Sequence, residues 1–356
     1  MKYLEVSAGK TALRTLQAEG FTQERFCAVL GASGGPKWFT LFGLDRYLFG
    51  EFFNNRTKPL HLIGSSAGAF RFAALAQKDP VAAIERLANH YSRITYSKKP
   101  TLDEISTKGE AMVDVVLGQH GATEIIANAK IHPHFITAQT KGFLAFEQKL
   151  LQFAGLTKSY LLNRINRRYL AKQYERVMFT PVVGQLQLSD PAQISTHEVL
   201  LTHTNLADAL LASGAIPLLL RGIRDIEGAP NGTYRDGGII DYHFDLNLSV
   251  KDQTNGLVLF PHFNSKPRAG WFDKKLKRTP LSSSYDNVVM LSPTKEFITE
   301  LPFGKIPDRE DFTALPADVR FEYWDKVLSL SSLLADDLSS LIEDQTLDLI
   351  KPLELN

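Results

Sequence analysis

The sequence predicts an α/β fold with a mainly parallel central sheet flanked by helices. Two units with the order strand, tight turn, helix follow one another early in the chain. In the first, the apolar run at residues 26–30 precedes a glycine-rich loop and a helix-like stretch at residues 39–49. In the second, an apolar run at residues 60–63 precedes a Gly-x-Ser-x-Gly pattern and the helix-forming residues 69–76. Successive units of this kind are typical of a parallel sheet with helices on its faces.

Later segments extend this pattern toward the C-terminus. Apolar spacing predicts further helices over residues 10–20, 81–91 and 110–117, and further strands over residues 132–140, 175–183, 257–260 and 288–291. The last forty residues place leucines among acidic residues, which indicates amphipathic helix packed on the main body. We therefore expect a main α/β unit over residues 1–295 and a helical C-terminal extension over residues 296–356 that is not independent of it.

Composition limits the class of function. The 356 residues include 40 basic and 39 acidic side chains, so no overall field attracts nucleic acid, and no nucleic-acid partner is expected. The single cysteine, Cys27, lies in an apolar run and is expected to be a small buried side chain. The first residues lack the apolar core of a signal peptide, and no stretch reaches the 18 or so apolar residues of a membrane span. A cytoplasmic protein is expected.

The pattern Gly64-Ser65-Ser66-Ala67-Gly68 lies where the second strand meets its helix. A serine at the centre of such a turn is held in an unfavourable backbone conformation with its hydroxyl exposed, and flanking glycines let strand and helix approach closely. The helix that follows directs free N–H groups toward the same place. Ser66 is therefore predicted to be a nucleophile, with Gly64 and Gly68 forming the elbow. A chance match to the pattern is the alternative.

The glycine-rich loop after the first strand is the second candidate element. Its Gly31 and Lys37 match part of a phosphate-binding loop, but Pro36 replaces a glycine N–H and Trp38 replaces the hydroxyl that would bind magnesium. The loop can instead present backbone N–H groups to a developing oxyanion, and Gly34 and Gly35 are the predicted donors. A tight turn with no catalytic role remains an alternative.

A serine hydroxyl needs a base to take its proton during attack. The candidate is Asp236, which is followed by Gly237 and Gly238 between apolar or aromatic residues, so that its carboxylate can be exposed at a strand end. An ordinary Asp-Gly turn is the alternative. Upstream, residues 209–220 predict a small-residue helix that stops at Pro217 and packs beneath the site.

Together these motifs resemble the patatin-like phospholipases, a family of acyl hydrolases. The matching segments, in the family's order, are residues 31–37, 64–68, 212–217 and 236–238. The resemblance implies a three-layer α/β/α fold and a catalytic dyad without histidine. Ser66 would attack an ester carbonyl, Asp236 would accept its proton, and the N–H groups of Gly34 and Gly35 would hold the oxyanion, with Lys37, Gly237 and Gly238 in support. The implied substrates are phospholipids, lysophospholipids or related acyl esters, and no cofactor is implied.

The chain departs from the family pattern in two places. Ser33 stands where the family has a first glycine, and Lys37 and Trp38 replace the arginine and glycine that usually end the loop. Residues 241–243 replace the usual Asn-x-Pro after the Asp-Gly-Gly motif. Two alternatives follow. One is a non-catalytic lipid- or protein-binding member of the family, and the other is an α/β-hydrolase esterase whose triad includes a histidine, His243 or His262.

Two basic segments that contain aromatic residues are candidates for contact with a membrane surface. Residues 160–172 predict a basic amphipathic helix, and residues 266–278 place a tryptophan and a phenylalanine among lysines and arginines. Solvated surface elements are the commoner explanation, and peripheral contact with an anionic membrane surface is the alternative. His132 and His134 have no obvious third ligand in the sequence, so no metal is predicted.

Overall fold

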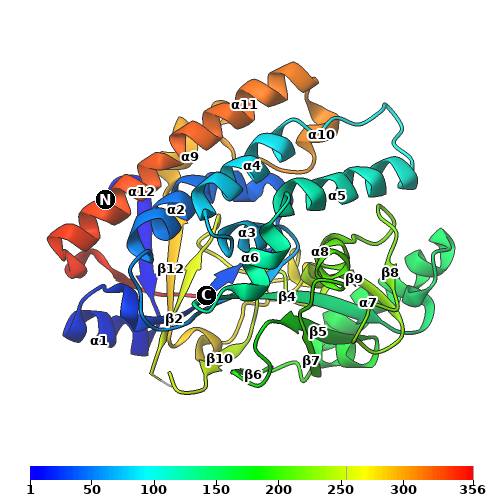
Figure 1. The fold of residues 1–356 in the computed structure, drawn as a ribbon, viewed down its shortest axis with the longest axis horizontal. Coiled ribbons are helices and arrows are strands. Elements are labelled where there is room, and N and C mark those ends of the chain that lie inside the picture. Colours follow the sequence, from blue (N-terminus) through cyan, green and yellow to red (C-terminus); the bar gives the residue numbers. More distant parts are fainter. Residues whose placement is uncertain (254, 356) are drawn as a thin grey trace.

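The structure is a computed structural model that describes residues 1–253 and 255–355. Its centre is an 11-stranded mixed sheet whose main path runs β13-β1-β12-β11-β2-β3-β4-β5-β7 (Figure 1). The strands of this sheet are β1 (Leu4–Ala8), β2 (Phe26–Gly31), β3 (Leu60–Ser65), β4 (Ile131–Thr140), β5 (Tyr174–Thr180), β7 (Thr196–Leu200), β8 (Ile223–Arg224), β9 (Thr233–Asp236), β11 (Leu257–Pro261), β12 (Val288–Pro293) and β13 (Lys351–Pro352). A separate pair joins β6 (Leu186–Ser189) to β10 (Asn247–Val250).

The strands at the middle of the sheet are parallel and buried. β12, β11, β2, β3 and β4 run parallel to one another, and every residue of β2 and β3 is buried. Burial on both faces explains why these strands read as continuous apolar runs in the sequence. The register pairs Gly31 with Gly64, so the two glycine turns lie side by side at the carboxyl ends of neighbouring strands.

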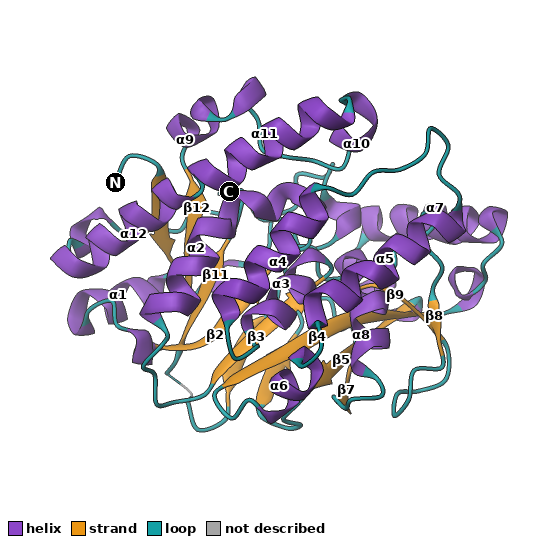
Figure 2. Ribbon diagram, turned by 45° about the horizontal axis from the view of Figure 1, so that its top comes forward, coloured by secondary structure: helices purple, strands orange, loops and turns teal. Residues whose placement is uncertain are grey.

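Helices cover the sheet in a three-layer α/β/α arrangement, as the family resemblance implies (Figure 2). The helices are α1 (Lys10–Glu19), α2 (Phe42–Tyr47), α3 (Ala67–Leu75), α4 (Pro80–Ser92), α5 (Leu102–Leu117), α6 (Gly121–Ala127), α7 (Lys149–Ile165), α8 (Leu206–Gly214), α9 (Lys295–Glu300), α10 (Asp311–Ala314), α11 (Ala317–Leu330) and α12 (Ser332–Asp344). α3 packs on β3 and is covered in turn by α4 and α5. Within the described residues, every helix is either too short or too polar to cross a lipid bilayer.

The C-terminal helices pack on the main body. α12 contacts α2, and α11 contacts the 3₁₀ helix Gly35–Leu41 that follows the glycine loop. The apolar face of this region is buried, with Trp324 and Leu338 fully enclosed. Beyond α12, β13 adds to the edge of the sheet in parallel with β1, pairing Ser7 with Lys351. The predicted amphipathic character of the last forty residues is thus confirmed.

Two local predictions are wrong. The helix predicted over residues 160–172 is in fact the end of α7, which stops at Ile165, followed by a separate 3₁₀ helix, Arg167–Lys172. The break lies at Asn166, which is extended (φ −156°) and whose side chain accepts a hydrogen bond from the Arg168 N–H. The second concerns residues 307–316: the sequence predicts a loop between the prolines at its two ends, but this stretch contains the short helix α10. Cys27 is buried, as expected, and burial raises the pKa of its thiol to about 12.

Candidate active site

Ser66 forms a strained turn between β3 and α3. Its backbone has φ 53° and ψ −122°, a region that side chains other than glycine rarely occupy. The turn is tight because a Cβ on Gly68 would lie 1.9 Å from the carbonyl oxygen of Gly31. It is fixed from α8, where Ser213 Oγ accepts the Ser66 N–H at 2.9 Å and donates to the Ile136 carbonyl at 2.8 Å. This geometry presents the Ser66 hydroxyl to the site.

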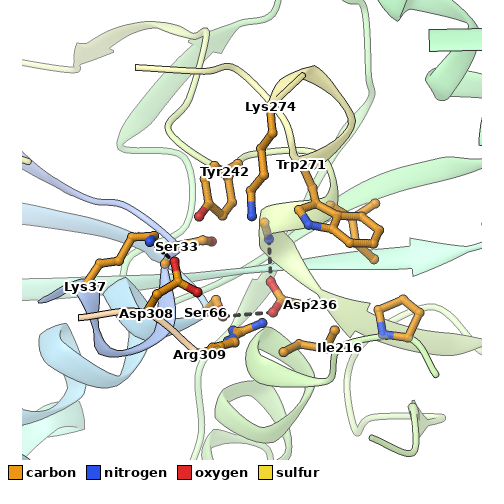
Figure 3. A pocket seen from close by; sticks show the side chains of 14 residues that line it. Ser33, Lys37, Ser66, Ile216, Asp236, Tyr242, Trp271, Lys274, Asp308 and Arg309 are labelled. Atoms are coloured by element: carbon orange, nitrogen blue, oxygen red, sulfur yellow. Dashed lines mark hydrogen bonds and ion pairs between the residues drawn. The ribbon is translucent and has the colours of Figure 1, made fainter. Parts of the chain in front are cut away.

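Asp236 reaches Ser66 from the end of β9. This strand pairs antiparallel with β4, and the register sets Asp236 opposite Thr137. Ser66 Oγ donates to Asp236 Oδ2 at 2.8 Å across 170 residues of sequence (Figure 3). The other carboxylate oxygen accepts the Gly238 N–H at 2.7 Å. The fold therefore brings together the two side chains that the sequence singles out, and Gly238 fixes the orientation of the carboxylate.

Burial controls the protonation of this pair. Ser66 and Asp236 are both buried, and burial raises the pKa of the Asp236 carboxyl above its ordinary value. The charge of Arg309, the Ser66 and Gly238 hydrogen bonds and the charge of Lys274 all act against this rise. A carboxylate whose pKa is raised is a stronger base than an exposed one once it is ionised.

The glycine loop lies beside the pair. In the part of the chain that the structure describes, the N–H groups of Gly34 and Gly35 have no hydrogen-bond acceptor. Gly35 has φ 59°, and a Cβ at this position would lie 2.7 Å from Arg309 Nε, so this side chain covers the loop. Lys37 forms an ion pair with Asp308, and burial lowers the pKa of its ammonium. The loop thus presents free backbone donors next to Ser66.

A second network fixes the glycine loop to the segment after Asp236. Ser33 donates its N–H to the Tyr242 carbonyl at 2.9 Å, and its Oγ lies 2.7 Å from Ser65 Oγ. Ser65 Oγ in turn donates to the Asp241 carbonyl at 2.6 Å. The Asp241 carboxylate is buried against Arg176, with N–O distances of 2.6 and 2.9 Å. Ser33, which departs from the family pattern, is therefore held by hydrogen bonds to Tyr242 and Ser65. Gly238 packs directly against Ser33, and a Cβ on Gly238 would lie only 2.4 Å from Ser33 Oγ.

The two histidines that follow Asp236 have other partners. His243 and His262 are buried with ring centroids 4.2 Å apart, and His243 Nδ1 accepts the Arg268 N–H at 2.9 Å. Burial lowers the pKa of both rings, that of His262 to about 3. Among the described residues, neither ring makes a hydrogen bond to Ser66 or Asp236.

Two cavities meet at Ser66. The first, which we call the charged cavity, has Ser66 and Asp236 in its wall together with Lys37, Lys274 and Arg309 (Figure 3). Lys274 lies with its ammonium 3.9 Å from the centroid of the Tyr242 ring, and desolvation and the nearby cations lower its pKa to about 8. Within the described residues, neither Lys274 nor Arg309 has an ion-pair partner.

Sequence reasoning missed both of these cations, Lys274 and Arg309, in the wall of this cavity. Lys274 belongs to the basic segment that was expected only to face solvent or a membrane, and Arg309 lies in the stretch expected to be plain loop. Neither position carries a pattern that points to the site. Only the packing of residues 271–274 and 308–309 around the glycine loop reveals them.

The second cavity, which we call the apolar cavity, has a volume of about 270 Å³. It extends from Ser66 between α3, α4, α5, α8 and α10. Its lining includes the large side chains of Trp38, Phe70, Tyr91, Tyr96, Met112, Leu211 and Phe312. Ile216 and Arg309 line both cavities, so they mark the boundary at which a ligand would pass from one to the other.

Comparison with known proteins identifies the family of the chain. A family model described as patatin-like phospholipase matches residues 33–243, more than half of the chain. The chain belongs to the patatin-like phospholipase family. The match ends before Lys274 and Arg309, so the charged cavity of this patatin-like chain is completed by residues beyond the matched segment. At the level of the family, these proteins are lipid acyl hydrolases.

Among solved structures, the patatin-like chain is similar to VipD from Legionella pneumophila, at 12% identity and a TM-score of 0.31, with 72% of this chain and 52% of that chain covered. It is also similar to human GIVD cytosolic phospholipase A2 in complex with methyl gamma-linolenyl fluorophosphonate, at 10% identity and a TM-score of 0.38, with 95% and 62% covered. The chain thus spans only about half to three fifths of the length of these proteins. No curated protein matches the sequence significantly. Among the described residues, no group of three or more His, Cys, Asp or Glu side chains is arranged so that it could hold a metal ion.

Proposed function

We propose that this protein is a serine acyl hydrolase that cleaves fatty-acyl ester bonds of phospholipids, lysophospholipids or related lipids. The observation that carries the proposal is the 2.8 Å hydrogen bond from Ser66 Oγ to Asp236 Oδ2 at the point where the apolar and charged cavities meet. A polar reacting group enclosed between an apolar and a cationic space suits an amphiphilic ester.

The proposed reaction has two halves. Ser66 Oγ attacks the ester carbonyl carbon while its proton passes to Asp236 Oδ2, and the carbonyl electrons move to the oxygen. The N–H groups of Gly34 and Gly35 stabilise this oxyanion. When the intermediate collapses, the alcohol departs with the proton from Asp236 and leaves an acyl-serine. Water then gives a proton to Asp236 and attacks the acyl carbon. When this second intermediate collapses, the bond from the carbon to Ser66 Oγ breaks, Asp236 returns the proton to Ser66 Oγ, and the fatty acid is released.

The two cavities supply the proposed subsites. The apolar cavity holds the acyl chain, because its lining offers burial to methylene groups. The charged cavity holds the leaving group, and Lys274 and Arg309 favour one that carries a phosphate or another anion. Because Arg309 lines both cavities, we propose that residues 296–356 belong to the same functional unit as residues 1–295. We further propose that lipid reaches the site from an anionic membrane surface to which the protein binds peripherally.

Labelling with a fluorophosphonate probe tests the proposed nucleophile. The wild-type protein is expected to form a stable phosphonyl adduct at Ser66, identified by peptide mass spectrometry, because the probe reacts with activated serines. Ser66→Ala is expected to remove the label. Failure of the folded wild-type protein to react would favour the non-catalytic alternative, in which the fold binds lipid without hydrolysing it.

Chain length should control the rate of hydrolysis. Across a series of p-nitrophenyl esters, kcat/KM is expected to rise roughly fourfold for each added methylene, the equivalent of ~0.8 kcal/mol per buried CH₂, until the apolar cavity is full. A matched pair of variants at Gly109 locates the chain. A Cβ there would contact Leu220 and Leu211 at 3.7 and 3.9 Å, so Gly109→Ala fits without displacing its neighbours.

The larger exchange Gly109→Leu, by contrast, projects its side chain into the apolar cavity. We expect this variant to shift the preferred chain to a shorter length while short esters are still hydrolysed, and Gly109→Ala to change the preference little. An unchanged length profile in Gly109→Leu would show that the acyl chain lies elsewhere.

A further inference from the structure

Helix α7 directs large apolar side chains toward solvent and polar side chains toward the body of the protein. Its outer face bears four large apolar side chains at helical spacing, with exposed fractions of 84% for Leu150, 64% for Phe153, 54% for Leu161 and 73% for Ile165. Phe143 and Phe146, just before the helix, are exposed as well. Helices on the surface of a soluble domain normally direct such residues inward. A contiguous exposed apolar surface of this kind marks an interaction site.

The inner face of α7 is polar because it holds the rims of the two cavities. Gln152 is buried, and its Oε1 accepts the N–H of Leu218, next to the cavity residues Pro217 and Leu219, at 2.8 Å. Asn163 is buried and donates to Asp273 Oδ1 at 2.9 Å. Asp273 sits between Trp271 and Lys274, which line the charged cavity. Helix α7 therefore holds two segments of the site by hydrogen bonds, one at Leu218 and one at Asp273.

Charge around α7 indicates what the outer face contacts. Residues 148–174 contain six basic residues and no acidic residue. Lys149, Lys158 and Arg164 are exposed on the helix itself, and Arg168 and Lys172 are exposed just beyond it. Apolar side chains flanked by lysine and arginine are typical of helices that lie in the interface of an anionic bilayer. In a symmetric dimer the same patch would face itself and oppose like charges, which disfavours a second copy as the occupant.

We propose that the outer face of α7, together with Phe143 and Phe146, docks on an anionic lipid surface and thereby presents the rims of the two cavities to it. The proposal rests on the proposed function, because it assigns the surface from which the ester is taken. Phe153 and Ile165 lie at lipid depth, the flanking cations lie among the head groups, and the polar inner face keeps Leu218 and Asp273 in place.

Vesicle co-sedimentation tests the docking surface. The test variant, called the α7 pair, carries both Phe153→Ser and Ile165→Ser. The matched control pair carries both Phe303→Ser and Leu349→Ser, which removes two apolar side chains with exposed fractions of 60% and 41% from other parts of the chain. We expect the α7 pair to lower the partition constant on vesicles of phosphatidylcholine with phosphatidylglycerol at least about tenfold, because the side chains that enter the lipid are lost. The control pair should bind as the wild type does.

Further measurements separate the docking proposal from the proposed function. Hydrolysis of a short dispersed ester without vesicles should be equal in the α7 pair and in the wild type. Wild-type binding should weaken on pure phosphatidylcholine and at raised salt. Equal vesicle binding by the α7 pair and the wild type would overturn the proposal, as would light scattering that shows a wild-type dimer which the α7 pair abolishes. A wild type that binds vesicles but hydrolyses no ester would support the docking surface and contradict the hydrolase.

Discussion

Asp236→Asn is expected to lower kcat/KM for ester hydrolysis by about 10²–10⁴-fold, the range that a positioned general base contributes. The amide has nearly the size of the carboxylate, and its oxygen can still accept the Gly238 N–H. Its NH2 group then stands where Oδ2 accepts the Ser66 hydroxyl, and this group cannot take the Ser66 proton. Steady-state kinetics with a short p-nitrophenyl ester measures the loss. Because the exchange keeps the shape of the site, thermal unfolding should show that the variant remains folded.

Three variants serve as controls for this prediction. Asp325→Asn makes the same chemical change at an exposed ion pair on α11 and should leave the kinetics unchanged. His243→Asn and His262→Asn test the triad alternative, and a loss of kcat/KM in either one equal to that in Asp236→Asn would contradict the dyad.

In the wild type, kcat/KM should rise with pH through a pKa above the ordinary aspartate value of about 3.9, because burial raises the pKa of Asp236 and only the ionised form is a base. An acid limb at or below that value would contradict the raised pKa.

Asp241→Asn is expected to lower the free energy of unfolding by about 3 kcal/mol, the lower end of the cost of breaking a buried ion pair. Asp241 and Arg176 are both fully buried, and the exchange leaves the guanidinium without its bidentate partner. The cost is at the lower end because Asp190 still contacts Arg176 at 2.7 Å. Chemical denaturation monitored by circular dichroism measures the change.

The exposed pair of Arg93 and Asp325 provides the stability control. Both side chains are about half exposed, so Asp325→Asn is expected to cost less than about 1 kcal/mol. If Asp241→Asn and Asp325→Asn cost the same, the buried pair would not be the element that fixes the segment after Asp236.

The sequence predicted those parts of the site whose geometry is set locally. The turn at Ser66 depends on neighbouring glycines, and Gly68 is needed because no Cβ fits beside Gly31. The parallel core strands could be found because burial on both faces makes them uniformly apolar. The Asp-Gly-Gly turn marked Asp236 as a candidate base, but a direct contact with Ser66 followed only from the family resemblance, because 170 residues separate the two and no local pattern fixes their distance.

The elements that the sequence did not predict depend on tertiary contacts. β13 is a two-residue edge strand, and it pairs with β1 from the opposite end of the chain. The end of α7 was misplaced because its apolar stripe faces outward and continues in the sequence as far as Tyr169, beyond the break at Asn166. Arg309 was missed because a lone arginine in a loop has no periodicity, and its place against Gly35 arises only when the C-terminal segment folds back.

The division of the charged cavity between two parts of the chain has an evolutionary consequence. The proposed dyad lies inside the segment that the family model matches, whereas Lys274 and Arg309, the proposed contacts of the leaving group, lie downstream of it. Bond cleavage and leaving-group selection can therefore diverge separately, and exchanging the loops that carry these two cations would retune head-group preference in a descendant or an engineered chimera without disturbing the nucleophile.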